Sequence, residues 1–283
     1  MHELGVFISK TARTEYKEKG RELARKAGAQ ILNPTFPVNI PNDIETVVGI
    51  GGNGSIKGIM EGIIKKNHPI NLLVVPGGSQ NGFYRSVNAA GATISDEQLI
   101  DGSVDGVREF NPPSVNGELF NHGAGFGKNV AIFEHLDEQL RTSPIPKDIR
   151  SIVAGLFAVA ANIKDDSYSE YVLQIASPGS FLGRFRTFPD QDVFSNDLTF
   201  AKIKGGTRKE IIISLARIFF SLAMRSPIPE DLVDIEKSDK FELIADKNLN
   251  VVNADGRIIR FELGSRISIS RGTKSVNVAA LTF

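Results

Sequence analysis

The first 95 residues alternate short apolar runs with amphipathic segments. The apolar runs are rich in Val, Ile and Leu and predict buried strands at residues 4–8, 30–32, 46–50 and 72–75. Between them, residues 14–27 interleave acids and bases before Gly28, and residues 56–66 carry an apolar stripe at helical spacing. Both segments predict helices, the first with Gly28 at its C-cap. This order predicts an open α/β sheet with mainly parallel strands, in which ligands bind beyond the carboxyl ends of the strands.

After residue 95 the chain changes to shorter alternating and β-branched segments separated by Gly, Asn, Asp and Pro turns. Such a pattern predicts an antiparallel β-sandwich. The expected strands are residues 101–110, 118–126, 168–175, 198–203, 232–237, 240–245 and 257–270, and the expected inserted helices are residues 130–141, 149–163 and 207–224. The helix from residue 149 is apolar on most faces. We interpret these faces as packing between domains, with contact to lipid as the alternative.

Length, charge and composition narrow the class of protein. A chain of 283 residues exceeds what one hydrophobic core usually organises and favours two domains. Lys plus Arg and Asp plus Glu both number 33, so net charge gives no case for a nucleic acid or an anionic membrane as partner. The basic residues of segment 14–27 are accordingly interpreted as a solvated helix face. The absence of cysteine excludes disulfides, thiolate nucleophiles and cysteine-based metal sites.

The sequence also bears on location. The N-terminus has no basic region followed by a long apolar one, so no signal peptide is expected. The most apolar stretches, residues 151–163 and 211–224, are short, and Arg217 interrupts the second. A cytoplasmic protein is therefore expected, with peripheral contact to a membrane left open. The oligomeric state is left open as well.

A glycine-rich turn follows the third predicted strand. Residues 49–54 contain four glycines, which allow a sharp turn and let phosphate oxygens approach the backbone N–H groups. A helix that begins near Ser55 adds unpaired N–H groups and the positive end of its dipole. We predict a phosphate site made by Gly51, Gly52, Asn53, Gly54 and Ser55. The alternative is a strand-to-helix turn without a ligand.

A second turn of similar design follows the fourth predicted strand. It reads Pro-Gly-Gly-Ser-Gln-Asn-Gly-Phe-Tyr-Arg-Ser at residues 76–86. Asn81 is expected to hydrogen-bond to a phosphate or a ribose, and Arg85 to add positive charge; Gly78 and Ser79 belong to the same cradle. By itself this segment predicts an N-capped helix with Ser79 or Asn81 as the cap. Paired with the first turn, it predicts the other wall of a cleft.

Together the two turns resemble the paired signatures of the diacylglycerol kinase catalytic domain family, which includes bacterial lipid kinases and sphingosine kinases. That family has Gly-Gly-Asp-Gly-Thr in the first turn and Pro-x-Gly-Thr-x-Asn-Asp-Phe-Ala-Arg in the second. Residues 120–127, Phe-Asn-His-Gly-Ala-Gly-Phe-Gly, resemble its Asn-x-Ala-Gly-x-Gly-Phe strand end. Asp255, Gly256 and Arg257 resemble its Asp-Gly-Glu turn. In order and spacing, the resemblance covers essentially the whole chain.

The resemblance implies a fold and a reaction. The fold is an N-terminal open α/β nucleotide-binding domain over residues 1–95, with residues 271–283 as a strand that could return to it, and a C-terminal β-sandwich over residues 96–270. The implied cofactor is ATP, with its phosphates over the first turn, and the implied reaction is phosphorylation of a lipid hydroxyl. In that reaction Asn53 and Ser55 would position the γ-phosphate, and Ser79 and Asn81 would hold the nucleotide.

The sequence departs from the family at the positions implied to be catalytic, Asn53, Asp255 and Arg257. Asn53 replaces an aspartate that can orient a hydroxyl or act through magnesium, which an amide does poorly. Arg257 replaces the glutamate implicated as general base, and an arginine stays protonated at physiological pH. Gly58 stands where the family's next helix carries a glutamate. The resemblance therefore favours kinase activity, whereas the loss of these acids argues against it.

The metal site is unknown for the same reason. Mg²⁺ is bound through carboxylate oxygens. The family's magnesium-associated stretch Asp-Gly-x-Leu-Asp has its nearest match in Ser-Asn-Asp-Leu-Thr at residues 195–199, where both key acids are absent. Asp43, Glu45, Glu61 and Asp255 are the candidates for compensation.

Two functions therefore stay open: an ATP-dependent lipid kinase, and a catalytically inactive kinase-fold protein that binds a nucleotide or another anionic ligand. Arg257 favours the second, because a cation in a phosphate cleft stabilises a bound anion. A scaffold role with an empty cleft is a weaker third. The four histidines are dispersed and lack metal-ligand spacing. His122 could face the cleft, although a structural histidine is the preferred interpretation.

Overall fold

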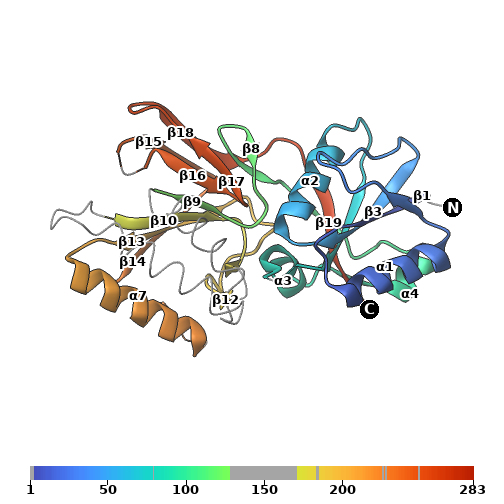
Figure 1. Ribbon diagram of the computed structural model, residues 1–283, viewed down its shortest axis with the longest axis horizontal. Coiled ribbons are helices and arrows are strands. Elements are labelled where there is room, and N and C mark those ends of the chain that lie inside the picture. Colours follow the sequence, from blue (N-terminus) through green and yellow to red (C-terminus); the bar gives the residue numbers. More distant parts are fainter. Residues whose placement is uncertain are drawn as a thin grey trace.

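The computed structural model describes residues 3–78, 80–127, 171–182, 185–224, 226, 228–247 and 249–283. Figure 1 shows two lobes side by side, each built on β-sheet. We call the one with the seven-stranded sheet the first lobe and the one with the antiparallel sheets the second lobe.

The sheet of the first lobe has the order β2-β1-β3-β4-β19-β5, with β6 paired to β19. Its strands are β1 (Glu3–Ile8), β2 (Gln30–Leu32), β3 (Ile44–Gly51), β4 (Asn71–Pro76), β5 (Thr93–Ser95), β6 (Arg108–Phe110) and β19 (Val276–Thr282). Every pairing is parallel except that of β6. The expected open α/β sheet with mainly parallel strands is confirmed.

Helices cover both faces of this sheet. They are α1 (Thr14–Ala27), α2 (Asn53–Ile64), α3 (Gly82–Ala89) and α4 (Asp96–Ile100). Apolar residues of α1 and α4 share one core with one face of the sheet, and those of α2 and α3 share another core with the opposite face. Gly28 has φ 62° and closes α1, as its position predicted. The second helix starts earlier than expected, because the glycine turn continues directly into it.

The C-terminal strand β19 lies between β4 and β5 and so completes the sheet of the first lobe. Its Val278 pairs with Leu72 of β4, and its Leu281 with Ile94 of β5. The chain therefore crosses from the first lobe to the second and returns. The expected domain limits stay a prediction.

The second lobe is a β-sandwich. Its six-stranded sheet has the order β14-β13-β10-β9-β16-β17, its four-stranded sheet the order β15-β18-β7-β8, and β11 pairs with β12. The strands are β7 (Pro113–Val115), β8 (Glu118–Leu119), β9 (Ala124–Phe126), β10 (Tyr171–Ser177), β11 (Phe181–Leu182), β12 (Phe185–Arg186), β13 (Leu198–Lys204), β14 (Val233–Ser238), β15 (Lys240–Ile244), β16 (Val251–Ala254), β17 (Arg257–Arg260) and β18 (Arg266–Arg271). The two larger sheets share one core, in which Phe126 and Phe200 face Ile267 and Ile269.

Three expected strands were wrong in extent. Of residues 101–110 only the last three form a strand, because residues 101–107 form turns after α4, which a capping box between Ser95 and Gln98 starts. Residues 118–126 and 257–270 are each divided into two strands. Helix α7 (Arg208–Ala223) matches the expected helix. The helices expected at residues 130–141 and 149–163 lie outside the described residues. In the part of the chain that is described, no helix is both long and apolar enough to cross a bilayer.

Candidate functional site

The two glycine turns lie side by side at the carboxyl ends of β3 and β4. Gly51 pairs with Pro76 across these strands. A Cβ atom on Gly78 would lie 2.5 Å from the Cα of Gly52, and one on Gly77 would lie 2.9 Å from the backbone nitrogen of Gly51. Glycine is therefore required here because the two backbones touch. The expectation that both turns lie on the same edge of the sheet is confirmed.

Asn53 connects the two turns through a side-chain bond to the start of α3. Its Oδ1 accepts a hydrogen bond from the backbone N–H of Phe83 at 3.3 Å, in the first turn of α3. Its carbonyl oxygen accepts one from Nδ2 of Asn121 at 3.0 Å. Asn81 is the N-cap residue of α3, one of the two that were expected, but its side chain makes no capping bond; a side-chain bond to the start of α3 comes instead from Asn53 of the neighbouring helix α2. Asn53 makes this bond as a neutral amide and brings no negative charge to the turn.

Asn81 shapes the second turn from within. Its φ is 53°, its Oδ1 accepts from the N–H of Gly78 at 2.8 Å, and its Nδ2 donates to the carbonyls of Pro76 and Gly78 at 3.0 and 2.9 Å. The expected contact of Asn81 with a nucleotide stays a prediction. Arg85 is exposed on α3, with Nε donating to the carbonyl of Gln80 at 3.3 Å. Ser79 lies outside the described residues.

Asp255 reaches the first turn from the second lobe. Its carboxylate accepts backbone N–H groups of Asn121 at 2.5 Å and of His122 and Gly123 at 3.1 Å each. Its carbonyl oxygen would lie 3.8 Å from a Cβ on Gly54. A carboxylate has about four acceptor positions, and three are used here. Asp255 therefore holds the loop between β8 and β9, which is the reason residues 118–126 are not one strand.

Arg257 forms an ion pair with Glu118 of β8. Its Nη1 lies 2.7 Å from Oε2 of Glu118, although its side chain is 66% exposed. The other oxygen of Glu118 pairs with Nζ of Lys57, a residue of α2 that is 7% exposed. Lys57 also donates to the carbonyl of Ala254 at 3.4 Å and lies 3.9 Å from Glu61. This cluster joins the lobes beside the first turn.

The sequence analysis did not identify Lys57 and Glu118 as site residues. One polar residue beside an apolar helical stripe gives no local sign that it will be buried. Its partner Glu118 lies 61 residues away along the chain.

The acids considered as compensation do not form a magnesium site. Asp43 and Glu45 lie at the amino end of β3, roughly 20 Å from its carboxyl end by strand geometry. A side chain on Gly58 would meet the ring of Phe36, whose Cδ1 would lie 2.1 Å from the added Cβ. Asp255 and Glu61 are engaged as described above. The described residues contain no group of three acids or histidines that could hold a metal ion.

The stretch at residues 195–199 offers main-chain and hydroxyl groups rather than carboxylates. Oγ1 of Thr199 is buried and donates to Oε1 of Gln191 at 2.8 Å. The carbonyl of Asp197 accepts from Gln191 and Arg271, and the Asp197 side chain is exposed. These residues do not fit the magnesium site that the family resemblance implies.

A pocket of about 370 Å³ opens beside the glycine turns. Its polar lining comes from Ser9, Lys10, Lys17 and Arg21, and its apolar lining from Ile8, Ile31, Leu32 and Pro34. The backbone N–H of Ser9 donates to the carbonyl of Ile50 at 2.9 Å, and its Cβ would lie 3.2 Å from a Cβ on Gly51. Ser9 of the pocket lining therefore lies next to the first turn.

Lys17 and Arg21 of α1 line this pocket, a role that the interpretation of the α1 basic residues as a solvated face did not include; Arg21 is exposed, as that interpretation predicts. The signal that could have found them is their place on the first turns of a helix that follows β1. The carboxyl end of β1 lies next to that of β3 in the parallel sheet.

His122 lies against the start of α3, where its Cε1 would be 2.0 Å from a Cβ on Gly82. Its carbonyl accepts from Oγ of Ser177 at 3.1 Å. Burial lowers the pKa of the His122 imidazole, and the nearby charge of Asp255 opposes this shift. The ring therefore favours the neutral state at physiological pH.

We expect His122 to weaken the protein on acidification. Because the folded-state pKa lies below the unfolded-state value of 6.5, the unfolded chain binds the proton first as the pH falls. The free energy of unfolding should fall with pH below about 6.5, by at most about 1.4 kcal/mol per pH unit from this group. Urea titrations of wild type and His122→Gln between pH 7 and pH 5 measure the difference, with His68→Gln as the matched control. Equal slopes for wild type and His122→Gln would contradict the assignment.

Comparisons with known proteins agree with this architecture. Residues 3–108 match the family model of the diacylglycerol kinase catalytic domain. Two solved structures of a "putative diacylglycerol kinase" from Bacillus anthracis str. Sterne have TM-scores of 0.63 and 0.62 at 13% and 15% identity. They cover 97% of this chain and 94% and 96% of their own. A third structure, of a diacylglycerol kinase from the same organism, has a TM-score of 0.58 at 12% identity and covers 97% of this chain and 96% of its own.

No curated protein matches the sequence. The resemblance expected from the two turns is nevertheless confirmed: residues 3–108 match the diacylglycerol kinase catalytic domain family, in a chain that shares its fold with these kinase structures over nearly its whole length.

Proposed function

We propose that this protein binds a nucleoside di- or triphosphate and has lost phosphoryl transfer. The observation that carries the proposal is the pocket beside the two touching glycine turns, lined by Lys10, Lys17 and Arg21. Backbone N–H groups at the start of α2 attract phosphate oxygens. The three side-chain cations add positive charge next to the turn. The apolar lining from Ile31, Leu32 and Pro34 suits the base or the ribose. A volume of about 370 Å³ lies within the usual range for small-ligand sites.

The proposed loss of phosphoryl transfer is argued from the partners of the charged side chains near the first turn. Phosphoryl transfer needs Mg²⁺ held by carboxylates and a base for the acceptor hydroxyl. Here the carboxylate of Asp255 holds three backbone N–H groups, and Glu118 holds Lys57 and Arg257. Phe36 occupies the space that a side chain at position 58 would need. These contacts support the proposed loss of transfer, because each carboxylate is engaged in structural hydrogen bonds or ion pairs.

An ATP-dependent lipid kinase is the second candidate, and the family match of residues 3–108 favours it. The assay that separates the two uses radiolabelled ATP, Mg²⁺ and a mixed lipid extract. The proposal expects no incorporation above that of Asn53→Ala. Incorporation by the wild type that Asn53→Ala abolishes would establish the kinase instead.

Binding itself gives the sharper prediction. ATP or ADP should raise the melting temperature equally in Mg²⁺ and in EDTA, because a ligand that binds only the folded state stabilises it. Replacing Arg21 by alanine should weaken nucleotide affinity roughly tenfold, the loss of one charge-assisted contact. Titration calorimetry measures the nucleotide affinities of the wild type and of the Arg21→Ala variant.

Arg25→Ala is the matched control, since Arg25 is an exposed arginine one turn further along α1. It should bind as the wild type does. Equal weakening by Arg21→Ala and Arg25→Ala would assign the effect to overall charge rather than to the pocket. The absence of any thermal shift with nucleotides would overturn the proposed function.

A further inference from the structure

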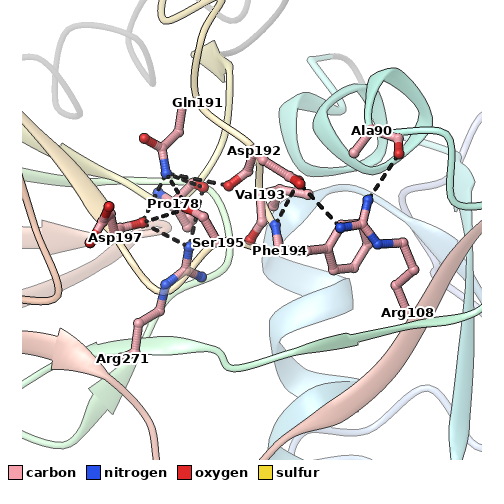
Figure 2. A network of polar contacts seen from close by, with 10 residues as sticks. All are labelled: Ala90, Arg108, Pro178, Gln191, Asp192, Val193, Phe194, Ser195, Asp197 and Arg271. Atoms are coloured by element: carbon pink, nitrogen blue, oxygen red, sulfur yellow. Dashed lines mark hydrogen bonds and ion pairs between the residues drawn. The ribbon is translucent and has the colours of Figure 1, made fainter.

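A partly buried arginine joins segments of the second lobe where they meet the first. Arg271 is the last residue of β18, shortly before the chain returns to the first lobe as β19. Its Nη1 donates to the carbonyl of Asn111 at 3.1 Å. Its Nη2 lies 3.4 Å from the carbonyl of Pro178, 3.2 Å from that of Val193 and 3.1 Å from that of Asp197. Figure 2 shows this guanidinium pointing into the loop that precedes β13.

The same loop enters the core of the first lobe. Val193 is fully buried there, among residues of α2, α3 and the sheet. Phe194 meets Phe110 of β6 edge to face, at 6.5 Å between ring centroids and 89° between ring planes. The loop that Arg271 holds is therefore one of the contacts through which the second lobe packs on the first.

A second arginine holds the loop from the side of the first lobe. The Arg108 guanidinium lies 4.3 Å from the centroid of the Phe194 ring. Its Nη2 lies 3.1 Å from Oδ2 of Asp192, and its Nη1 donates to the carbonyl of Ala90, just after α3, at 3.0 Å. Asp192 and Phe194 are thus fixed from β6 while Val193 and Asp197 are fixed from β18.

The charge of Arg271 requires that the guanidinium keep its polar partners. Burial lowers the pKa of the Arg271 guanidinium to about 10, and the charges of Asp192 and Asp197 oppose the shift. The group is still a cation at neutral pH, and a cation that is partly withdrawn from water is stabilised by polar partners. Carbonyl oxygens from four positions compensate it here, and the planar fork of an arginine reaches several of them at once, which a lysine cannot.

The junction connects to the candidate site through the segment after β10. Pro178, held by Arg271, follows Ser177, whose Oγ donates to the carbonyl of His122 at 3.1 Å. The backbone N–H of Phe181 in the same segment donates to Oγ of Ser86 in α3 at 3.2 Å. The elements that carry His122 and α3 are therefore supported from Arg271.

We propose that the Arg271 guanidinium is a built-in cation that locks the two lobes in one orientation. Removal of the fork releases the loop of residues 189–197 from the second lobe and lets the lobes move relative to each other. Arg271 acts as a positioning residue; it does not touch the proposed nucleotide.

The test measures lobe orientation directly. The chain has no cysteine, so Glu18→Cys on α1 and Asp239→Cys beyond β14 introduce a clean pair of spin labels, one on each lobe. In the parent, pulsed electron paramagnetic resonance should give one narrow distance distribution. Arg271→Ala should broaden it and lower the melting temperature by roughly 5 °C or more. Low millimolar guanidinium should narrow the distribution of Arg271→Ala again, whereas sodium chloride of equal ionic strength should not.

Two further variants keep the proposal falsifiable. Arg260→Ala removes an exposed arginine of β17 and should keep the narrow distribution. If Arg271→Ala does not fold, Arg271→Lys, which keeps the charge without the fork, carries the test and should broaden the distribution. A narrow distribution in a folded Arg271 variant overturns the lock, even when its melting temperature falls, because the arginine would then be only a packing residue.

Discussion

Replacing Gly78 with alanine should lower the free energy of unfolding by about 3 kcal/mol and abolish stabilisation by nucleotides. The added methyl carbon would lie 2.5 Å from the Cα of Gly52 and 2.9 Å from Oδ1 of Asn81. The first of these atoms is backbone, so one glycine turn has to move away from the other. The proposed phosphate cradle would be made by the backbones of both turns, so the displacement should remove nucleotide binding together with the close packing.

The measurement is a urea titration followed by circular dichroism, since the chain has no tryptophan. Gly54→Ala is the matched control in the same turn, because the new Cβ would lie 3.8 Å from the carbonyl oxygen of Asp255, an ordinary contact. That variant should unfold at the wild-type urea concentration. A Gly78→Ala protein as stable as Gly54→Ala would contradict the close contact between the two turns.

Replacing Asp255 with asparagine should cost about 2–4 kcal/mol of stability and loosen the loop next to the first turn. The carboxylate accepts the N–H groups of Asn121, His122 and Gly123. An asparagine offers one oxygen and turns its NH₂ group toward the remaining donors. Backbone strain does not contribute to this loss of stability, because asparagine tolerates the φ of 50° found at this position.

Hydrogen exchange identifies the cause. The amides of residues 121–123 should exchange faster in Asp255→Asn than in wild type, while those of β3 and β4 stay protected. Asp105→Asn, which alters an exposed carboxylate bonded to Ser103, is the control and should leave both stability and exchange unchanged. Unaltered exchange at residues 121–123 would show that Asp255 does not support this loop.

Much of the first lobe could be predicted from residues that are close in sequence. The bounds of α1 and β2 were predicted to the residue, because apolar periodicity and a C-capping glycine act within one or two turns of chain. The second lobe was predicted less well. Its segment 118–126 has the composition of one strand, yet Asp255, more than 130 residues later, breaks it by binding the backbone of its middle residues.

The candidate site divides in the same way. The two glycine turns and their common edge followed from the strand order. The bond of Asn53 to the start of α3, the pairing of Arg257 with Glu118 and the burial of Lys57 did not. The pocket was missed because the basic residues of α1 look solvated in a sequence that does not show the neighbouring end of β2.

By itself the sequence determined the elements of the first lobe from β1 to β4, the position of both glycine turns and the family that they resemble. These features depend on the period of apolar residues and on the backbone freedom of glycine, which are local properties. Only the tertiary structure decided what the polar side chains do. The partners of Asn53 and Asp255 lie 30 and 134 residues away, so no local sequence pattern indicates that the hydrogen bonds of these side chains are made to distant backbone groups.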